Sequence, residues 1–229
     1  MSGRERTIRS FVRRAGRKTP GQERALDELW PLFGIGESDA ILDLTSIYDR
    51  EAPVVLEIGF GNGESLVEQA QLHPQLNYLG IEVHMPGVGH CLLHIEDQNV
   101  SNIRLMTHDA IDVLQNRLAD CALARLNLYF PDPWPKKRHH KRRLIQPGFL
   151  ELVARKLAPD GEFFIATDWA NYAEHIDQVI EQDNTLRLVN RLEHSGEAPI
   201  DRPTTKFERR GLGKGHKIWD WQLRKNSTT

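Results

Sequence analysis

The chain has 229 residues, a formal net charge of −2 and two cysteines. That length is enough for one large α/β domain whose core needs neither a metal nor a disulfide. The longest apolar run falls far short of the roughly 18 residues of a membrane span, so we expect neither a transmembrane nor a secreted protein. Because Cys91 and Cys121 stand in no metal-ligand or CxxC spacing, a cytoplasmic protein with free thiols is expected.

Positive charge is concentrated in three segments of the chain. Residues 4–18, 136–143 and 202–225 hold 21 of the 30 Lys and Arg residues but only three of the 32 acids, which leaves the rest of the chain strongly acidic. Segregated positive charge suits a polyphosphate partner, because each neutralised phosphate releases counterions. Three solvated charge runs would give the same composition. We favour nucleic acid as the partner.

Strand and helix patterns alternate along the chain. A basic arm over residues 1–18 is followed by a short helical pattern over residues 20–33 and then by five strand–helix repeats. The predicted strands are Val54–Ile58, Tyr78–Val83, Ile103–Met106, Leu123–Phe130 and Phe163–Thr167, and the helices after them are Gly63–Leu72, Val88–Asp97, Ile111–Leu118, Pro147–Leu157 and Tyr172–Glu181. The alternation predicts an α/β fold with a doubly wound, mostly parallel sheet. Trp219–Leu223 alternates apolar and polar residues, which adds an antiparallel terminal strand, and residues 19–229 are expected to form one domain behind a flexible arm.

A glycine-rich loop follows the first predicted strand. Gly59, Gly61 and Gly63 alternate between strand and helix, where the backbone can turn tightly and approach a ligand closely. The third glycine comes one residue earlier than in the GxGxxG pattern of dinucleotide sites, and Glu57 just before the loop would repel a pyrophosphate. A carboxylate there suits a ligand that carries an ammonium and a sulfonium. A tight turn without a ligand would also explain the glycines.

Two further acids end the second and third predicted strands. Glu82 lies about 20 residues beyond the loop, the spacing at which an acid binds ribose hydroxyls. Asp109 ends the third strand, and it could equally cap the helix that follows. The carboxyl ends of parallel strands meet at the edge where open α/β sheets bind ligands. Together with Glu57, these acids resemble the S-adenosylmethionine site of a Rossmann-like methyltransferase.

The fourth strand runs into the loop Phe130–Pro135 and then into the basic run 136–143. Its three alternating prolines restrict φ and would hold Asp132 and Trp134 rigidly at the sheet edge. A rigid turn in which the acid caps the backbone would require the same residues. An acid and an aromatic side chain beside a phosphate-binding run nevertheless favour chemistry on an RNA base.

The sequence FPDPWPKKRHHKRR resembles the signature of the tRNA (guanine-N7-)-methyltransferases. EIGFGNG, GIEVHMPGVG, the stretch Asn102–Asp109, ATDWANYAEH and RPTTKFERRG are similar to that family's blocks in the family's order, so the likeness covers Ile8–Leu223. The resemblance implies a class I enzyme that methylates N7 of guanosine at nucleotide forty-six, in the variable loop of tRNA. It implies S-adenosylmethionine as methyl donor, S-adenosylhomocysteine as product, no metal and no obligate protein partner.

The resemblance also implies roles for individual residues, and Asp132 is the one expected to be catalytic. The expected cofactor-binding residues are Glu57, Gly59, Gly61, Gly63, Glu82, Asp109 and Asp132. The expected substrate-binding residues are Lys136, Asp168, Thr205, Lys206, Phe207 and Glu208. On the sequence alone, Asp168 could instead cap the next helix.

Two other functions stay open. An NAD-dependent oxidoreductase would share the fold class, but the glycine spacing, Glu57 and the basic run disfavour it. A non-catalytic tRNA-binding protein would keep the fold, but intact acids at four strand ends argue against it. A zinc site at His90 and His94 is not expected, because structural zinc sites need four ligands.

Overall fold

The computed structural model describes residues 16–196 and 202–226. Most of the predicted basic arm, residues 1–15, lies outside the described part, and residues 16–18 are exposed coil. Among the described residues, no helix is both long and apolar enough to cross a membrane.

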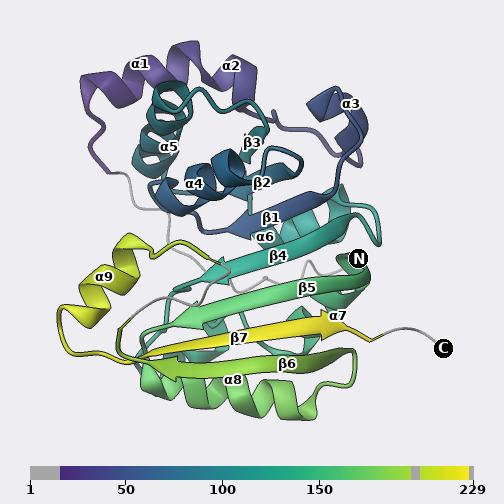
Figure 1. Ribbon diagram of the computed structural model, residues 1–229, viewed down its shortest axis with the longest axis vertical. Helices are drawn as coiled ribbons and strands as arrows, with labels where there is room; N and C mark the ends of the chain where they lie inside the picture. Colours follow the sequence, from purple (N-terminus) through teal and green to yellow (C-terminus); the bar gives the residue numbers. More distant parts are fainter. Residues whose placement is uncertain (1–15, 197–201, 227–229) are drawn as a thin grey trace, which may run out of the picture.

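A seven-stranded sheet forms the centre of the structure (Figure 1). Its strands are β1 (Val54–Ile58), β2 (Asn77–Ile81), β3 (Ile103–Met106), β4 (Leu123–Tyr129), β5 (Leu157–Thr167), β6 (Leu186–His194) and β7 (Ile218–Lys225). Their order across the sheet is β3-β2-β1-β4-β5-β7-β6. The first five strands are parallel, and β7 pairs antiparallel with both β5 and β6. The prediction of a doubly wound, mostly parallel sheet with an antiparallel strand is confirmed.

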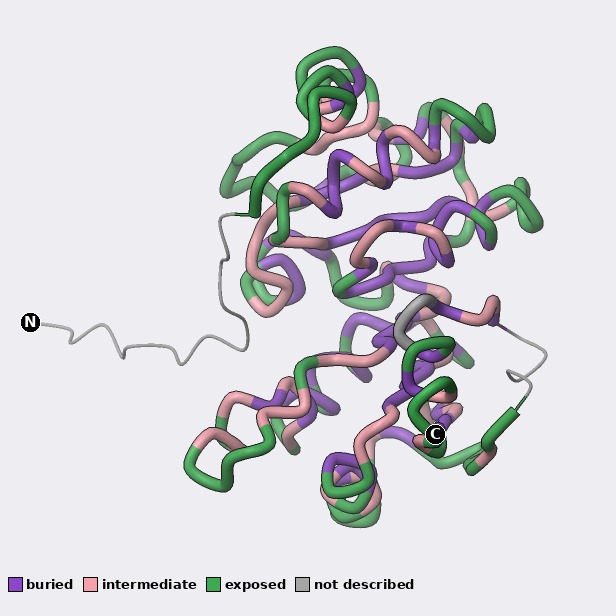
Figure 2. The backbone as a smooth tube through the Cα atoms, turned by 90° about the vertical axis from the view of Figure 1, so that its left-hand side faces the viewer, coloured by how far each residue is buried: buried purple, intermediate pink, exposed green. Residues whose placement is uncertain are grey.

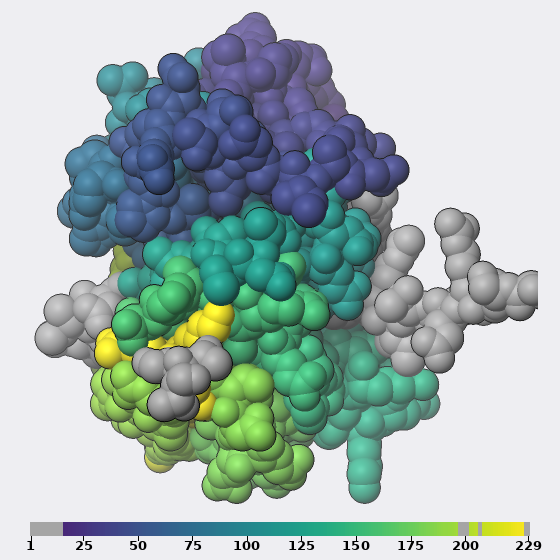
Figure 3. Space-filling model, turned by 90° about the vertical axis from the view of Figure 1, so that its right-hand side faces the viewer, coloured from purple at the N-terminus to yellow at the C-terminus, as the bar shows by residue number. Residues whose placement is uncertain are grey.

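Helices cover both faces of this sheet. They are α1 (Pro20–Glu28), α2 (Trp30–Phe33), α3 (Leu44–Tyr48), α4 (Glu64–Leu72), α5 (Met85–Asp97), α6 (Ala110–Asp112), the π-helix η1 (Val113–Arg117), the 3₁₀-helix η2 (Lys137–Arg142), α7 (Pro147–Lys156), α8 (Ala170–Gln182) and α9 (Lys206–Leu212). The N-terminal part of the described chain, coloured purple to blue, lies above the C-terminal part, coloured green and yellow (Figure 3).

The two larger hydrophobic clusters of the described residues hold the layers together. Alternate residues of a strand point to opposite faces, so Val55 and Tyr78 pack with α1, α4 and α5. Leu56, Leu126 and Phe163 point the other way and pack with η1, α7 and α8. The central strands are therefore buried on both faces, which is why they read as continuous apolar runs.

Several elements differ from the prediction, and α3, η2 and α9 were not predicted at all. Strand β6 was not predicted, because it is an edge strand whose residues 187–193 are exposed on both faces and show no clear apolar alternation. Strand β5 begins at Leu157, six residues before the predicted start. The helix predicted over Ile111–Leu118 is a short α-turn, α6, that continues as the π-helix η1.

Candidate active site

The carboxyl ends of the parallel strands, the edge that faces the viewer in Figure 2, carry the predicted site. At the end of β1 the three glycines Gly59, Gly61 and Gly63 all have positive φ, of 76°, 59° and 82°. A Cβ at Gly63 would lie 2.3 Å from Cys91 Sγ, so glycine lets α4 start against α5. A Cβ at Gly59 would meet none of the described residues within 4 Å, so they leave the space beside that glycine open.

Glu57 is a buried carboxylate with an unsatisfied oxygen. It is 3% exposed, and its Oε2 has no hydrogen-bond partner in the described structure. Burial raises the pKa of Glu57 to about 7, although the nearby guanidinium of Arg125 opposes this shift. On β4 the residue in register with Glu57 is Asn127, whose Nδ2 is likewise buried without a partner. Unsatisfied buried polar atoms are costly, so the acceptor Oε2 of Glu57 fits a bound cationic group, whereas the donor Nδ2 of Asn127 fits a hydrogen-bond acceptor.

Glu82 connects β2 to the glycine loop. Its Oε2 accepts a hydrogen bond from the backbone N–H of Gly61 at 2.9 Å. Its Oε1 accepts hydrogen bonds from the N–H groups of Val83 and His84, at 2.7 and 2.9 Å. The side chain that was expected to bind ribose therefore also fixes the loop that would surround the cofactor.

Asp109 lies one strand further along the same edge. Its Oδ1 accepts a hydrogen bond from the N–H of Ile111 at 2.9 Å, so the helix-capping alternative is realised for this oxygen. The sequence analysis raised this cap as an alternative, whereas it did not assign the backbone contacts of Glu82.

An open hollow lies beside these two acids. It is lined by Leu26, Trp30, Ile35, Gly36, Glu37, Met85, Thr107 and His108. Both ring nitrogens of His108 are buried, and neither has a hydrogen-bond partner among the described residues. A mostly apolar hollow with a few polar atoms is typical of a small-molecule site. Sequence analysis did not find Trp30, Met85 or His108, because they come from three separate segments.

The loop after β4 carries two residues in strained backbone conformations. Phe130 and Trp134 have φ of 52° and 45°, a region that bulky residues rarely adopt and that clusters at functional sites. Asp132 between them is exposed. The Arg142 guanidinium lies 4.9 Å from the centre of the Trp134 ring. An exposed acid and a cation-covered indole thus share one stiff loop, and Lys136, also exposed, follows it.

Asp168 follows β5 at the same edge. No side chain in the described part of the chain caps α8, so the capping alternative for Asp168 is not realised. Its Oδ2 lies 3.3 Å from Nδ1 of His216, a residue that the sequence analysis did not single out. Both side chains are about one-third exposed, 30% for Asp168 and 36% for His216.

Thr205 and Glu208 form a capping box at the start of α9. The Thr205 hydroxyl accepts from the N–H of Glu208 at 3.1 Å, and the Glu208 carboxylate accepts from the N–H of Thr205 at 3.3 Å. Glu208 is fully buried and also binds Arg202. Thr205 and Glu208, which were predicted to contact the substrate, therefore stabilise the start of α9. The side chains of Lys206 and Phe207, the other two residues of this block, lie outside the described part.

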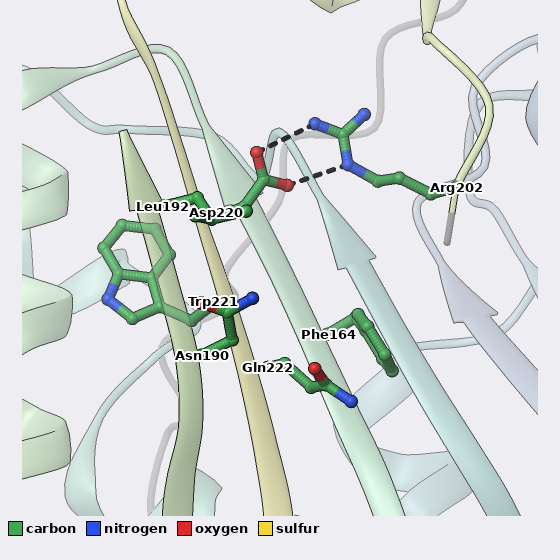
Figure 4. A pocket seen from close by; sticks show the side chains of 7 residues that line it. All are labelled: Phe164, Asn190, Leu192, Arg202, Asp220, Trp221 and Gln222. Atoms are coloured by element: carbon green, nitrogen blue, oxygen red, sulfur yellow. Dashed lines mark hydrogen bonds and ion pairs between the residues drawn. The ribbon is translucent and has the colours of Figure 1, made fainter. Parts of the chain in front are cut away.

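Two ion pairs place α9 at the sheet edge. Arg202 binds Asp220 on β7 through two hydrogen bonds of 2.8 and 3.1 Å, and both residues border a small pocket on the sheet (Figure 4). Arg209 binds Glu64, the first residue of α4, at 2.8 Å. The predicted substrate block is thereby held beside the glycine loop.

This strand order, with a glycine loop after β1 and acids at successive strand ends, defines a class I methyltransferase fold. A solved structure described as an antibiotic-related methyltransferase shares the fold with a TM-score of 0.60 at 14% identity, over 83% of this chain and 96% of that one. The methyltransferase family model Methyltransf_4 matches residues 51–221.

Curated relatives match nearly the whole chain. The tRNA (guanine-N(7)-)-methyltransferase of Alkalilimnicola ehrlichii is 54% identical, over 96% of this chain and 94% of its own length. The protein of the same name from Sodalis glossinidius is 52% identical, over 96% of this chain and 92% of its own length. The chain belongs to the tRNA (guanine-N7-)-methyltransferase family. This membership excludes the oxidoreductase alternative.

Proposed function

We propose that the protein transfers a methyl group from S-adenosylmethionine to N7 of guanosine at nucleotide forty-six, in the variable loop of cytoplasmic tRNA. One observation carries this proposal. Glu57, whose Oε2 has no hydrogen-bond partner among the described residues, lies at the same edge of the sheet as the exposed carboxylate of Asp132 and residues 136–142 of the basic run. The names of relatives more than 50% identical over nearly full length support it.

The residues present fit S-adenosylmethionine, which supplies a methyl group on a positively charged sulfur. Glu57 would face the positive charge of the donor, because its unpaired Oε2 is buried at the base of the glycine loop. Glu82 and Asp109 would hold the ribose and the base, next to the hollow that His108 borders. Gly59 leaves open space for a ligand.

The chemistry required at the guanine is modest. N7 carries an in-plane lone pair, so no proton has to be removed before transfer and no strong general base is needed. The purine becomes positively charged as N7 is methylated, and a fixed carboxylate beside it stabilises that charge. Asp132 takes this role, and the proline-stiffened loop keeps it in place. Trp134 and Arg142 form the adjoining wall.

Transfer of label from radioactive S-adenosylmethionine to an unmodified tRNA transcript tests the proposal. We expect 7-methylguanosine in the digested product, and none from a transcript with adenosine at nucleotide forty-six. A protein that binds the transcript but transfers no methyl group would be the non-catalytic tRNA-binding alternative. Label at another nucleotide would contradict the position while leaving the reaction class intact.

Glu82→Ala should weaken S-adenosylmethionine binding by about 1–3 kcal/mol, the usual cost of leaving buried hydrogen-bonding groups unpaired. The carboxylate now satisfies three backbone N–H groups, one of them in the glycine loop. Titration calorimetry measures the change, and Glu68→Ala on the exposed side of α4 is the matched control. Wild-type affinity in the Glu82 variant would show that this acid has no part in the cofactor site.

Removing residues 1–18 should lower tRNA affinity and leave S-adenosylmethionine affinity unchanged. Seven of these residues are Lys or Arg. Each lost phosphate contact should reduce the slope of log affinity against log salt by about 0.7–0.9. Filter binding over a range of salt concentrations measures the slope. An unchanged slope would mean that the arm is a plain tail.

A further inference from the structure

The last arginine of the basic run differs from its neighbours. Lys137, Arg138 and Lys141 are exposed, as phosphate contacts must be, whereas Arg143 is only 3% exposed. Burial lowers the pKa of Arg143, since water no longer solvates its charge. A phosphate at the surface would find the guanidinium already enclosed by protein. Arg143 therefore needs another explanation than the rest of the run.

The Arg143 guanidinium joins two loops. Its Nε donates to the carbonyl oxygen of Pro133 at 3.0 Å. Its Nη2 donates to Oδ1 of Asn171 at 2.7 Å, and its Nη1 donates to the Asn171 carbonyl oxygen at 3.3 Å. Its carbon Cζ lies 4.8 Å from the centre of the ring of Tyr172, which is fully buried. One planar group thus binds the loop after β4 and the first turn of α8 together.

A contribution to fold stability does not by itself explain why an arginine is buried at this position. Besides three oxygens, the guanidinium of Arg143 contacts Nε2 of His140 through Nη2 at 3.2 Å. The three oxygens are neutral, and burying a cation against neutral oxygens costs free energy. Apolar residues of similar volume often stabilise such a position as well or better. What an apolar side chain lacks is the planar fork, which fixes the direction of several oxygens at once. The buried guanidinium of Arg143 therefore fixes the positions of the groups that it binds.

Pro133 lies between the proposed catalytic acid and a residue of the adjoining wall. Its neighbours are Asp132 and Trp134, and the φ of 45° at Trp134 persists only where the surroundings over-determine the backbone. Asn171 comes three residues after Asp168. By holding the Pro133 carbonyl to Asn171, Arg143 fixes the spacing between an acid from the end of β4 and an acid from the end of β5.

We propose that Arg143 is a positioning residue for methyl transfer, which clamps the Asp132–Trp134 loop to α8 and does not bind tRNA phosphate. The inference rests on the proposed function of this site. It divides the basic run by role: the exposed cations dock the tRNA, and Arg143 sets the geometry of the loop that meets the guanine.

The test compares Arg143→Met and Arg143→Lys with Arg138→Met. With both substrates saturating, Arg143→Met should lower the single-turnover rate at least tenfold while the salt slope of tRNA binding stays at its wild-type value. Arg143→Lys keeps the charge but lacks the fork, so it should not restore the rate. Arg138→Met should instead reduce the salt slope by about 0.7–0.9. Arg155→Met, at an α7 side chain that is 56% exposed, is the control expected to change neither quantity.

Hydrogen exchange gives a readout that is independent of activity. The amides of Asp132 and Trp134 should exchange faster in Arg143→Met without any substrate, as should those in Asn171→Ala, whose exposed side chain makes it a safe second variant should the first not fold. The double variant should be no slower in methyl transfer than Arg143→Met alone, because the two residues form one clamp. Unchanged exchange and a rate within threefold of wild type would overturn the proposal, as would a salt slope that falls as it does for Arg138→Met. An inactive wild-type enzyme would instead contradict the proposed function, and the exchange data would still decide whether the clamp exists.

Discussion

Asp132→Asn should lower the single-turnover rate of methyl transfer about a hundredfold to a thousandfold, the usual effect of losing a preorganised electrostatic partner. Asparagine keeps the shape of the side chain but removes the negative charge that faces the purine as it becomes positive. Folding should survive, because Asp132 is exposed and a surface substitution usually changes stability by about 0.5 kcal/mol or less. The cofactor-side acids lie on other strands and are untouched.

Single-turnover transfer with both ligands saturating measures this effect, since a binding defect then cannot imitate a chemical one. Asp27→Asn on the exposed side of α1 is the control. A rate within about threefold of wild type would mean that the carboxylate has no part in the transition state. A lost rate with an unchanged pH profile supports electrostatic stabilisation, whereas loss of an acidic limb leaves base catalysis open.

The parallel half of the sheet was predictable because burial on both faces leaves a simple signal. Strand β1, Val54–Ile58, was placed at its observed bounds, and all five of its residues are buried. The opposite holds for β6, where seven successive residues are exposed and carry polar and apolar side chains in no clear order. Its position depends on hydrogen bonds to β7, a strand more than twenty residues later, which local patterns do not report.

The same distinction applies to the site. Glu57, Glu82 and Asp109 could be grouped from the sequence because parallel topology brings strand ends to one edge. The roles of Thr205 and Glu208 in capping α9 could have been predicted, since T-x-x-E before a helix is the pattern of a capping box. The burial of Arg143 could not be predicted, because in the sequence it stands in one run with five other cations that are exposed or half-exposed. His216 reaches Asp168 only through the fold of the chain after α9.

Glu57→Gln should have opposite effects on stability and on cofactor affinity. The folded protein holds a proton on Glu57 up to a pKa of about 7, against an ordinary value of 4.5. Between these two values the folded state binds more protons than the unfolded state, so wild-type stability falls as the pH rises from 4.5 to 7. The glutamine variant escapes this loss, and without cofactor it should be more stable at pH 8 by about 3 kcal/mol. Below pH 4.5 the two proteins should unfold alike.

For cofactor affinity the order of the two proteins should be reversed, with the wild type binding more tightly than Glu57→Gln at pH 8. A cationic ligand beside Oε2 binds the ionised carboxylate, so wild-type affinity should weaken about thirtyfold from pH 8 to pH 5.5 as Glu57 takes up its proton. The glutamine variant should bind S-adenosylmethionine about 2–5 kcal/mol more weakly at pH 8, with no such dependence on pH. Titration calorimetry in buffers of different ionisation enthalpy counts the proton released by the wild type near pH 6, and Glu151→Gln on α7 is the control. Identical stability curves for wild type and Glu57→Gln would show that the carboxylate is ionised throughout. A pH-independent affinity in the wild type would show that the ligand's positive charge lies elsewhere, and Glu57 would then be only a buried acid under the glycine loop.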